Sequence, residues 1–202
     1  MQQVRGFVSV PVVNNIHAIK KDLQAIRPVG LFYLHEGDRM KKVLIIGIVA
    51  SGKTTLAKRL SQKMNIPSYE LDGIVHPQTP DGRYKRTADE QVEVIMDIDK
   101  NGAWIFEGTD RESYQCLFDM ADTIIFLDTP LWKRRIRIFT RFLKQQLGIE
   151  KCHYQSDLTM LKMMYKWTRD FESNRANFES KLQSYQHKVI RLHDNKDLSF
   201  VK

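Results

Sequence analysis

Residues 42–56 read Lys-Val-Leu-Ile-Ile-Gly-Ile-Val-Ala-Ser-Gly-Lys-Thr-Thr-Leu, and residues 47–54 within them match G-x-x-x-x-G-K-[ST]. The apolar run before the match is typical of a buried strand, and Leu56, Leu60 and Met64 recur behind it at helical spacing. In a strand-loop-helix of this kind, loop N–H groups and the helix N-terminus face phosphate oxygens, and glycines permit close approach. The segment predicts nucleotide binding, with Lys53 on the outer phosphates and Thr54 on Mg²⁺. The predicted nucleotide-binding residues are Gly47, Ala50, Ser51, Gly52, Lys53, Thr54 and Thr55.

The rest of the chain from Lys41 alternates short β-branched runs with amphipathic stretches. This alternation predicts an α/β fold with helices around a parallel sheet. The predicted strands are 42–46, 67–71, 103–106, 123–127 and 188–192. Helices are expected at 52–64, from a Thr87/Glu90 capping box to Asn101-Gly102, after a second such box at Thr109/Glu112, from Pro130 to Gly148, and at 158–185.

Composition favours one globular domain. The chain has 202 residues, of which 42% are hydrophobic and 28% charged, and no apolar run approaches the length of about 20 residues that spans a bilayer. Two cysteines cannot form a disulfide framework, and no secretory signal opens the chain. We therefore expect a soluble cytoplasmic protein with reduced thiols and no membrane partner.

Residues 1–39 do not follow the α/β rhythm, and they contain Pro11, Pro28 and Gly30. Met40 stands directly before the first predicted strand. We expect an N-terminal extension over 1–39, outside the core, and a nucleotide-binding domain over 40–202. A start at Met40 in the native protein is one hypothesis for this division.

The order of several motifs resembles the P-loop kinases of the adenylate kinase and shikimate kinase type, and most closely the DNA topology modulation-like proteins. Besides the loop, the likeness rests on residues 69–72 (Tyr-Glu-Leu-Asp), 104–108 (Trp-Ile-Phe-Glu-Gly) and 121–130 (Ala-Asp-Thr-Ile-Ile-Phe-Leu-Asp-Thr-Pro). The resemblance implies a three-layer P-loop NTPase fold, with a five-stranded parallel sheet of order 2-3-1-4-5 and a helical lid. One departure is Ala50, which stands where these kinases usually have glycine.

Two carboxylates are candidates at the ends of predicted strands. Glu107 follows the third strand, where it could face Mg²⁺ or orient an acceptor; the alternative is a solvated turn. Asp72 is expected to end the second strand on the same face as Glu70, where it could accept a hydroxyl proton or hold the acceptor in line; the alternative is again a solvated strand end.

Arginines are the candidates for neutralising charge on a transferred phosphoryl group. Arg134, Arg137 and Arg141 follow i, i+3, i+7 spacing on one helix face, with Arg135 beside them, and we choose Arg137 and Arg141 as catalytic. A solvated basic surface is the alternative. The resemblance implies an acceptor-binding role for Arg111, and residues 73–87 have the composition of an acceptor-binding flap.

These patterns predict a Mg²⁺- and ATP-dependent phosphotransferase for a small-molecule acceptor, with nucleoside monophosphates ahead of sugars. The second hypothesis is a nucleotide-dependent regulatory or nucleic-acid-associated P-loop protein, because residues 131–191 hold fourteen Lys and Arg against five Asp and Glu, and the whole chain carries +8. No helix-turn-helix or zinc-finger pattern supports that hypothesis. The sequence does not identify the acceptor or the oligomeric state.

Overall fold

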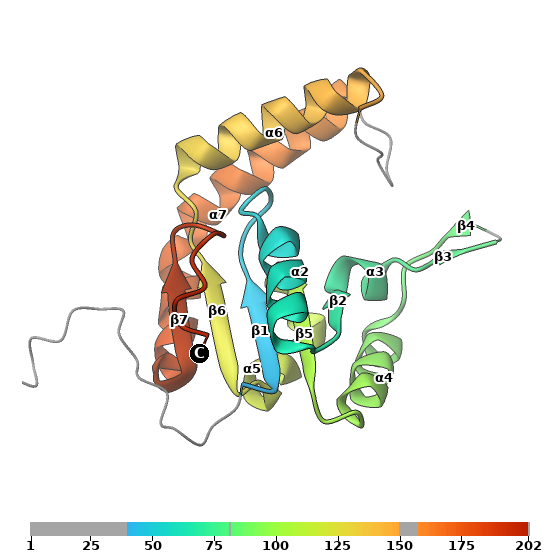
Figure 1. Cartoon of the computed structure of the whole chain (residues 1–202). Helices are drawn as coiled ribbons and strands as arrows, with labels where there is room; N and C mark the ends of the chain where they lie inside the picture. Colours follow the sequence, from blue (N-terminus) through green and yellow to red (C-terminus); the bar gives the residue numbers. More distant parts are fainter. Residues whose placement is uncertain (1–39, 81, 150–156, 202) are drawn as a thin grey trace, which may run out of the picture. The chain divides into compact units, whose positions relative to one another are not determined.

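The computed structural model describes residues 40–80, 82–149 and 157–201. Its centre is a parallel sheet of five strands, which lie in the order β2-β5-β1-β6-β7 (Figure 1). Numbered along the chain, that order is 2-3-1-4-5, as predicted. The strands are β1 (Lys42–Ile46), β2 (Ser68–Glu70), β5 (Trp104–Gly108), β6 (Thr123–Leu127) and β7 (Val189–Leu192).

Alternate side chains of each strand enter different hydrophobic clusters, because successive residues of a strand point to opposite faces. On β1, Val43 and Ile45 pack with α2 (Lys53–Met64) and the C-terminal residues Leu198 to Val201, while Leu44 and Ile46 pack on the other face. That other face is covered by the helices α3 (Leu71–Val75), α4 (Ala88–Asp99), α5 (Cys116–Met120) and α7 (Leu158–Ser184), together with the 3-10 turn η1 (Glu112–Tyr114). The fold is therefore a three-layer α/β sandwich around a parallel sheet.

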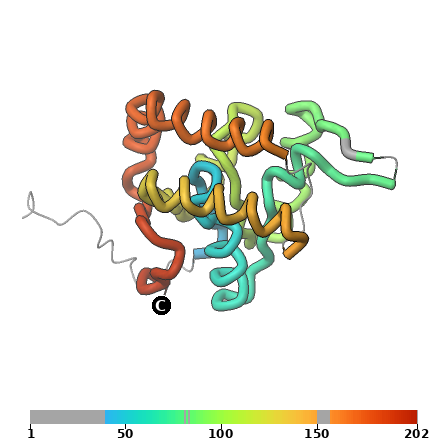
Figure 2. Tube along the Cα trace, turned by 90° about the horizontal axis from the view of Figure 1, so that it is seen from above, coloured from blue at the N-terminus to red at the C-terminus, as the bar shows by residue number. Residues whose placement is uncertain are grey.

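Two long helices extend beyond the carboxyl ends of the strands. α6 (Leu131–Gln146) and the first half of α7 lie above the sheet in Figure 1, and Figure 2 shows them running side by side. They pack through Ile138 of α6, and the Tyr165 hydroxyl donates to the backbone carbonyl of Arg135 at 3.1 Å. The last element before β7 is the turn η2 (Gln186–Lys188).

The hairpin of β3 (Gln78–Thr79) and β4 (Gly82–Arg83) projects from the segment predicted as a flap. Next along the chain, the predicted capping box is present at the start of α4: Thr87 accepts from the Glu90 N–H, and the Glu90 carboxylate accepts from the Thr87 N–H at 2.7 Å. At the other end of α4, Asp99 accepts from the Trp104 indole at 2.8 Å and pairs with Lys42 at 2.7 Å. These contacts join α4 to β5 and β1.

Two local predictions are wrong. β2 ends at Glu70, and Asp72 lies in the first turn of α3, so Glu70 and Asp72 do not share a strand face. The turn follows from close packing, since a Cβ on Gly108 would lie 2.9 Å from the Leu71 side chain. Thr109 forms no helix cap either; its carbonyl instead accepts from the buried Tyr114 hydroxyl.

The predicted extension at 1–39 and Cys152 fall outside the described residues. Cys116 is a free thiol. Within the described part of the chain, no helix is both long and apolar enough to cross a membrane.

Candidate active site

The phosphate loop connects β1 to α2, and its backbone takes the left-handed conformation twice. Ala50 has φ 60° and Gly52 has φ 100°, and the Gly52 carbonyl accepts from the Leu56 N–H at 3.1 Å as α2 begins. Gly47 is enclosed: a Cβ there would lie 2.8 Å from the Ser51 hydroxyl oxygen and 2.9 Å from the Leu127 carbonyl oxygen. Glycine is thus required at the start of the loop by space, and at Gly52 by backbone conformation.

Lys53 supplies the cation of the loop. Its ammonium donates to the Ile48 carbonyl at 3.1 Å, which folds the side chain back over the loop. Burial lowers the pKa of Lys53 below its ordinary value of 10.5, while the charges of Glu107 and Asp72 oppose this shift. The half-buried ammonium of Lys53 is suited to bind a phosphate that enters between it and the two carboxylates.

Thr54 and Glu107 meet across the first turn of α2 and the end of β5. The Thr54 hydroxyl donates to Glu107 Oε1 at 2.5 Å, and Glu107 is only 5% exposed. Burial raises the pKa of Glu107, against the attraction of Lys53. In the β2–β5 register Glu70 stands directly beside Glu107, and its charge raises the same pKa further.

This oxygen pair fits Mg²⁺. Magnesium in nucleotide sites takes one or two protein oxygens and completes its shell with phosphate oxygens and water, so a threonine hydroxyl beside one carboxylate is an adequate donor set. No group of three or more His, Cys, Asp or Glu side chains that could hold a metal alone occurs among the described residues. Thr54 and Glu107 are therefore the residues that would hold the ion together with the nucleotide.

Two side chains donate hydrogen bonds to backbone carbonyls of the phosphate loop. The Thr129 hydroxyl, just after β6, donates to the Ser51 carbonyl at 2.9 Å. Arg137 of α6 donates to the same carbonyl at 2.6 Å and to the Ala50 carbonyl at 3.3 Å. Arg137, which the sequence analysis chose as a catalytic arginine, therefore lies at the loop and donates to its backbone carbonyls.

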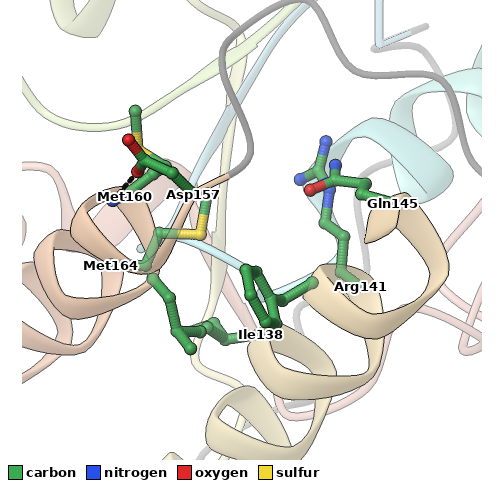
Figure 3. A pocket seen from close by; sticks show the side chains of 8 residues that line it. Ile138, Arg141, Gln145, Asp157, Met160 and Met164 are labelled. Carbon is green, nitrogen blue, oxygen red and sulfur yellow. Dashed lines mark hydrogen bonds between the residues drawn. The ribbon is translucent and has the colours of Figure 1, made fainter. Parts of the chain in front are cut away.

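The other two arginines of the predicted face have different surroundings. Arg134 is 1% exposed; it donates to the Thr129 carbonyl at 2.9 Å and forms an ion pair with Glu172 of α7. Arg134 is therefore a structural cation. Arg141 lies one turn beyond Arg137, and its charge lowers the pKa of Lys53. Figure 3 shows Arg141 beside Gln145 on α6, across a small cavity from the start of α7.

On the opposite side of the loop, Arg111 meets Asp72. Arg111 Nη2 lies 2.7 Å from Asp72 Oδ1, and the two side chains are 35% and 61% exposed. Arg111 also lines an open cleft of about 550 Å³ between the phosphate loop, the segment after β5 and α7. The structure therefore brings the predicted acceptor residues Asp72 and Arg111 together, although Asp72 reaches this position from a helix. Glu107 does not line this cleft; it is buried against Thr54.

The far wall of the cleft comes from α7, which no sequence motif had connected with the site. Asn174, Asn177 and Lys181 line it, and Lys181 pairs with Asp110 at 2.5 Å across the cleft. These three residues follow i, i+3, i+7 spacing, which would have marked a polar helix face but not its neighbour. In the predicted flap, Arg86 donates to the Ile74 carbonyl at 2.8 Å and so anchors α3.

The segment that follows β7 also contacts the phosphate loop. Asn195 lies over Gly52, where an added Cβ would stand 2.8 Å from its amide nitrogen, and Arg59 of α2 donates to the Asn195 carbonyl at 2.8 Å. The segment after β7 therefore borders the nucleotide side of the loop. Thr55, also predicted at the nucleotide, is exposed in the first turn of α2.

Comparison with known proteins gives limited matches. No protein-family profile matches the sequence. A shikimate kinase from Flavobacterium psychrophilum is 44% identical over 36 residues, which are 18% of this chain and 21% of that protein. The match thus spans about a fifth of the length of this curated relative.

Three solved structures resemble the chain at low identity. A shikimate kinase from Bacteroides thetaiotaomicron is 14% identical with a TM-score of 0.47, covering 80% of this chain and 92% of that one. A shikimate kinase from Aquifex aeolicus is 20% identical with a TM-score of 0.39, covering 77% and 86%. A sugar kinase from Janibacter sp. HTCC2649 is 16% identical with a TM-score of 0.37, covering 66% and 94%. At these scores the chemistry of the site has to be argued from the residues of this chain.

Proposed function

We propose that this chain is a Mg²⁺- and ATP-dependent phosphotransferase that acts on a small-molecule acceptor, with nucleoside monophosphates as the leading acceptor class. The observation that carries the proposal is the joint placement of Lys53, Thr54 and Glu107. A cation with a depressed pKa stands beside a hydroxyl and a carboxylate that are 2.5 Å apart, at the carboxyl end of a parallel sheet. This is the region in which open α/β folds bind ligands.

Catalysis in this scheme is positioning plus charge stabilisation. Bound Mg²⁺ would neutralise charge on the β- and γ-phosphates, and Thr54 and Glu107 would hold it. Lys53 binds the outer phosphate oxygens. Arg141, whose charge already acts on Lys53, is the cation we assign to the transferred group. Arg137 is a positioning residue, because its hydrogen bonds fix the carbonyls of Ala50 and Ser51 and so aim the loop N–H groups at the phosphates.

The acceptor is assigned to the cleft that contains Arg111. An acceptor oxygen would form the new bond to the γ-phosphorus while the bond to the bridging oxygen breaks and ADP leaves. Arg111 is bound to Asp72 in this structure. A phosphate on the acceptor offers Arg111 a second anion, and Asp72, once released, can orient the acceptor or take its proton. Because Arg111 can exchange Asp72 for the phosphate of an acceptor, we propose phosphorylated acceptors in preference to neutral ones.

The finer grouping with the DNA topology modulation-like proteins remains a prediction from sequence motifs, because the matched proteins are described as shikimate and sugar kinases. The acceptor panel therefore has to include shikimate and simple sugars beside nucleosides and nucleoside monophosphates. It also has to allow for the second hypothesis, nucleotide binding without transfer.

The test is transfer of labelled phosphate from ATP to each acceptor with and without Mg²⁺. Lys53→Ala should abolish transfer, since it removes the cation on the outer phosphates. Lys58→Ala is the matched control, because Lys58 is an exposed lysine of the same helix. Circular dichroism establishes that both variants are folded. Transfer that survives in Lys53→Ala, or Mg²⁺-ATP binding with no transfer to any acceptor, would contradict the proposal.

A further inference from the structure

One face of α6 is apolar and points away from the molecule. Five large side chains recur along it at intervals of three or four residues and are between 43% and 72% exposed. The opposite face is the packed one, since Arg134 and Ile138 are the buried residues of the helix. We call the exposed face the outer stripe; it consists of Trp132, Ile136, Phe139 and Leu143 of α6 and of Leu147, the residue that caps the C-terminus of the helix. At 1.5 Å per residue it is about 22 Å long.

The outer stripe is bordered by cations. α6 contains six Lys and Arg and no Asp or Glu. At about 100° per residue, Arg135 falls roughly a quarter turn to one side of the stripe, and Lys133 and Lys144 fall a quarter turn to the other. Arg135 and Lys144 are exposed, and neither forms an ion pair with any residue in the described ranges 40–80, 82–149 and 157–201. A partner of this face must therefore be apolar at its centre and anionic at its margins.

The shape and charge of the stripe favour one of three kinds of partner: a second copy of the chain, a single-stranded nucleic acid or a lipid surface. The stripe lies on the side of α6 opposite the buried residues Arg134 and Ile138, so it presents the surface of a single helix. A second copy of α6 would set one row of cations against another, and a seam of about two heptads is short for a coiled coil. Single-stranded nucleic acid stacks on aromatic rings, but three of the five stripe residues are aliphatic. An anionic lipid surface accepts a ridge, an apolar centre and flanking cations together.

We propose that α6 is a membrane-surface contact, lying in the plane of an anionic bilayer with the outer stripe at the boundary of headgroups and acyl chains. Arg135 and Lys144 reach the lipid phosphates, with their aliphatic stems against the stripe. Trp132 is at one end of the stripe, in an environment that suits an indole ring. The contact uses the side of α6 opposite Arg134, and it does not depend on the phosphotransferase proposal.

The experiment uses the full chain and sedimentation with vesicles of phosphatidylcholine, alone or with about 30% phosphatidylglycerol. Binding should favour the anionic vesicles by at least about tenfold. The stripe variant Ile136→Ser/Phe139→Ser/Leu143→Ser should reduce binding by at least about tenfold, because it removes half-exposed side chains without touching the packed face. Met96→Ser removes an apolar side chain of α4 that is 42% exposed; it is the control and should bind like the parent chain.

The charge requirement is tested separately. Arg135→Gln/Lys144→Gln should weaken binding about thirtyfold at low salt, at roughly 1 kcal/mol for each charge near the surface. Lys58→Gln/Lys100→Gln removes two cations elsewhere and should have little effect. In a Trp167→Phe background, brominated lipid should quench Trp132, whereas Trp104 is fully buried.

Four results would overturn the proposal. They are the absence of vesicle binding, equal binding by the stripe variant and the parent chain, equal losses in the two charge variants, and a dimer in light scattering that the stripe variant dissociates. Binding of a single-stranded oligonucleotide in place of vesicles would assign the face to nucleic acid. Thermal unfolding of each variant shows whether a loss of binding reflects a loss of fold.

Discussion

Ala50 is the residue whose replacement tests the geometry of the phosphate loop most directly. Its φ of 60° places an L-residue with a side chain in the left-handed region. Ala50→Gly should therefore relieve strain. The Ser51 carbonyl next to it is already fixed by Thr129 and Arg137, so the loop has no need of the methyl group to keep its shape.

The expected change in the free energy of unfolding is the difference between two contributions. The left-handed conformation costs an L-residue roughly 1–2 kcal/mol, and glycine does not pay this cost. Glycine also gives the unfolded chain more freedom, which costs the folded state about 0.4–1 kcal/mol. The net stabilisation is about 0.5–1 kcal/mol, or a rise in Tm of about 2 °C for a chain of this size.

The assay is thermal and urea unfolding of Ala50→Gly beside Ala57→Gly. Ala57 is 2% exposed in the middle of α2, where glycine costs about 1 kcal/mol in helix propensity, so this control should lower Tm. The two substitutions remove the same atoms and should have opposite signs. If Ala50→Gly lowers Tm as Ala57→Gly does, the strain argument is refuted and the methyl group stabilises the loop.

Three further substitutions test the packing around the site. Gly108→Ala should destabilise by about 1–3 kcal/mol in urea unfolding, because the new Cβ meets the buried Leu71 side chain at 2.9 Å; a neutral result would show that α3 shifts freely. Arg134→Met should cost about 2 kcal/mol in the same assay through its lost hydrogen bonds between α6 and α7, and a loss below about 0.5 kcal/mol would contradict its structural role. Asp99→Asn should cost about 0.5–1 kcal/mol at pH 7, because the Lys42 ammonium and a tryptophan N–H hold the pKa of Asp99 below its ordinary value of 3.8. A depressed pKa stabilises the fold above pH 3.8 and ceases to do so as pH falls through the folded value, so the two unfolding curves should converge in acid; a difference that persists there would assign the effect to packing.

The strands of the sheet could be predicted from the sequence because each is a buried run between clear turn signals. β1 at Lys42–Ile46 and β6 at Thr123–Leu127 match the prediction residue for residue. Both are flanked by strands on either side and covered on both faces, so every position except Lys42 at the start of β1 is apolar or β-branched. The capping box at Thr87 could also be predicted, because Thr87 and Glu90, the two residues that form it, lie within one helical turn of each other.

The errors concern segments whose conformation depends on distant partners. Asp72 reads as the end of a strand, but β2 is an edge strand whose pairing stops at Glu70, and the packing of Leu71 on Gly108 turns the chain into α3. The spacing of Thr109 and Glu112 imitates a capping box. Arg111 between them has an extended backbone, with φ −143°, and reaches Asp72 across 39 residues.

The candidate site shows the same division. The loop residues could be proposed from the sequence because a phosphate site made of backbone groups constrains a contiguous stretch of sequence. The roles of Arg134 and Arg137 could not be separated, since spacing places both on one face but does not reveal that Glu172 lies under one and the Ser51 carbonyl under the other. The polar wall that α7 gives to the cleft was missed for the same reason.

The excess of Lys and Arg over Asp and Glu in residues 131–191 serves several structural roles. These roles bear on the second hypothesis, a regulatory or nucleic-acid-associated protein. Part of it is neutralised inside the fold, where Asp128 alone pairs with both Arg175 and Arg191, and the pKa of Arg175 is raised by its carboxylate partners. Another part faces the phosphate loop. Arg135 and Lys144 form no ion pair within the described part of the chain and so can attract an external polyanion, and both border the outer stripe. A nucleic acid that used these cations and stacked on Trp132 and Phe139 would still leave the three exposed aliphatic side chains of the stripe uncovered, whereas an anionic lipid surface would cover all five and contact the cations.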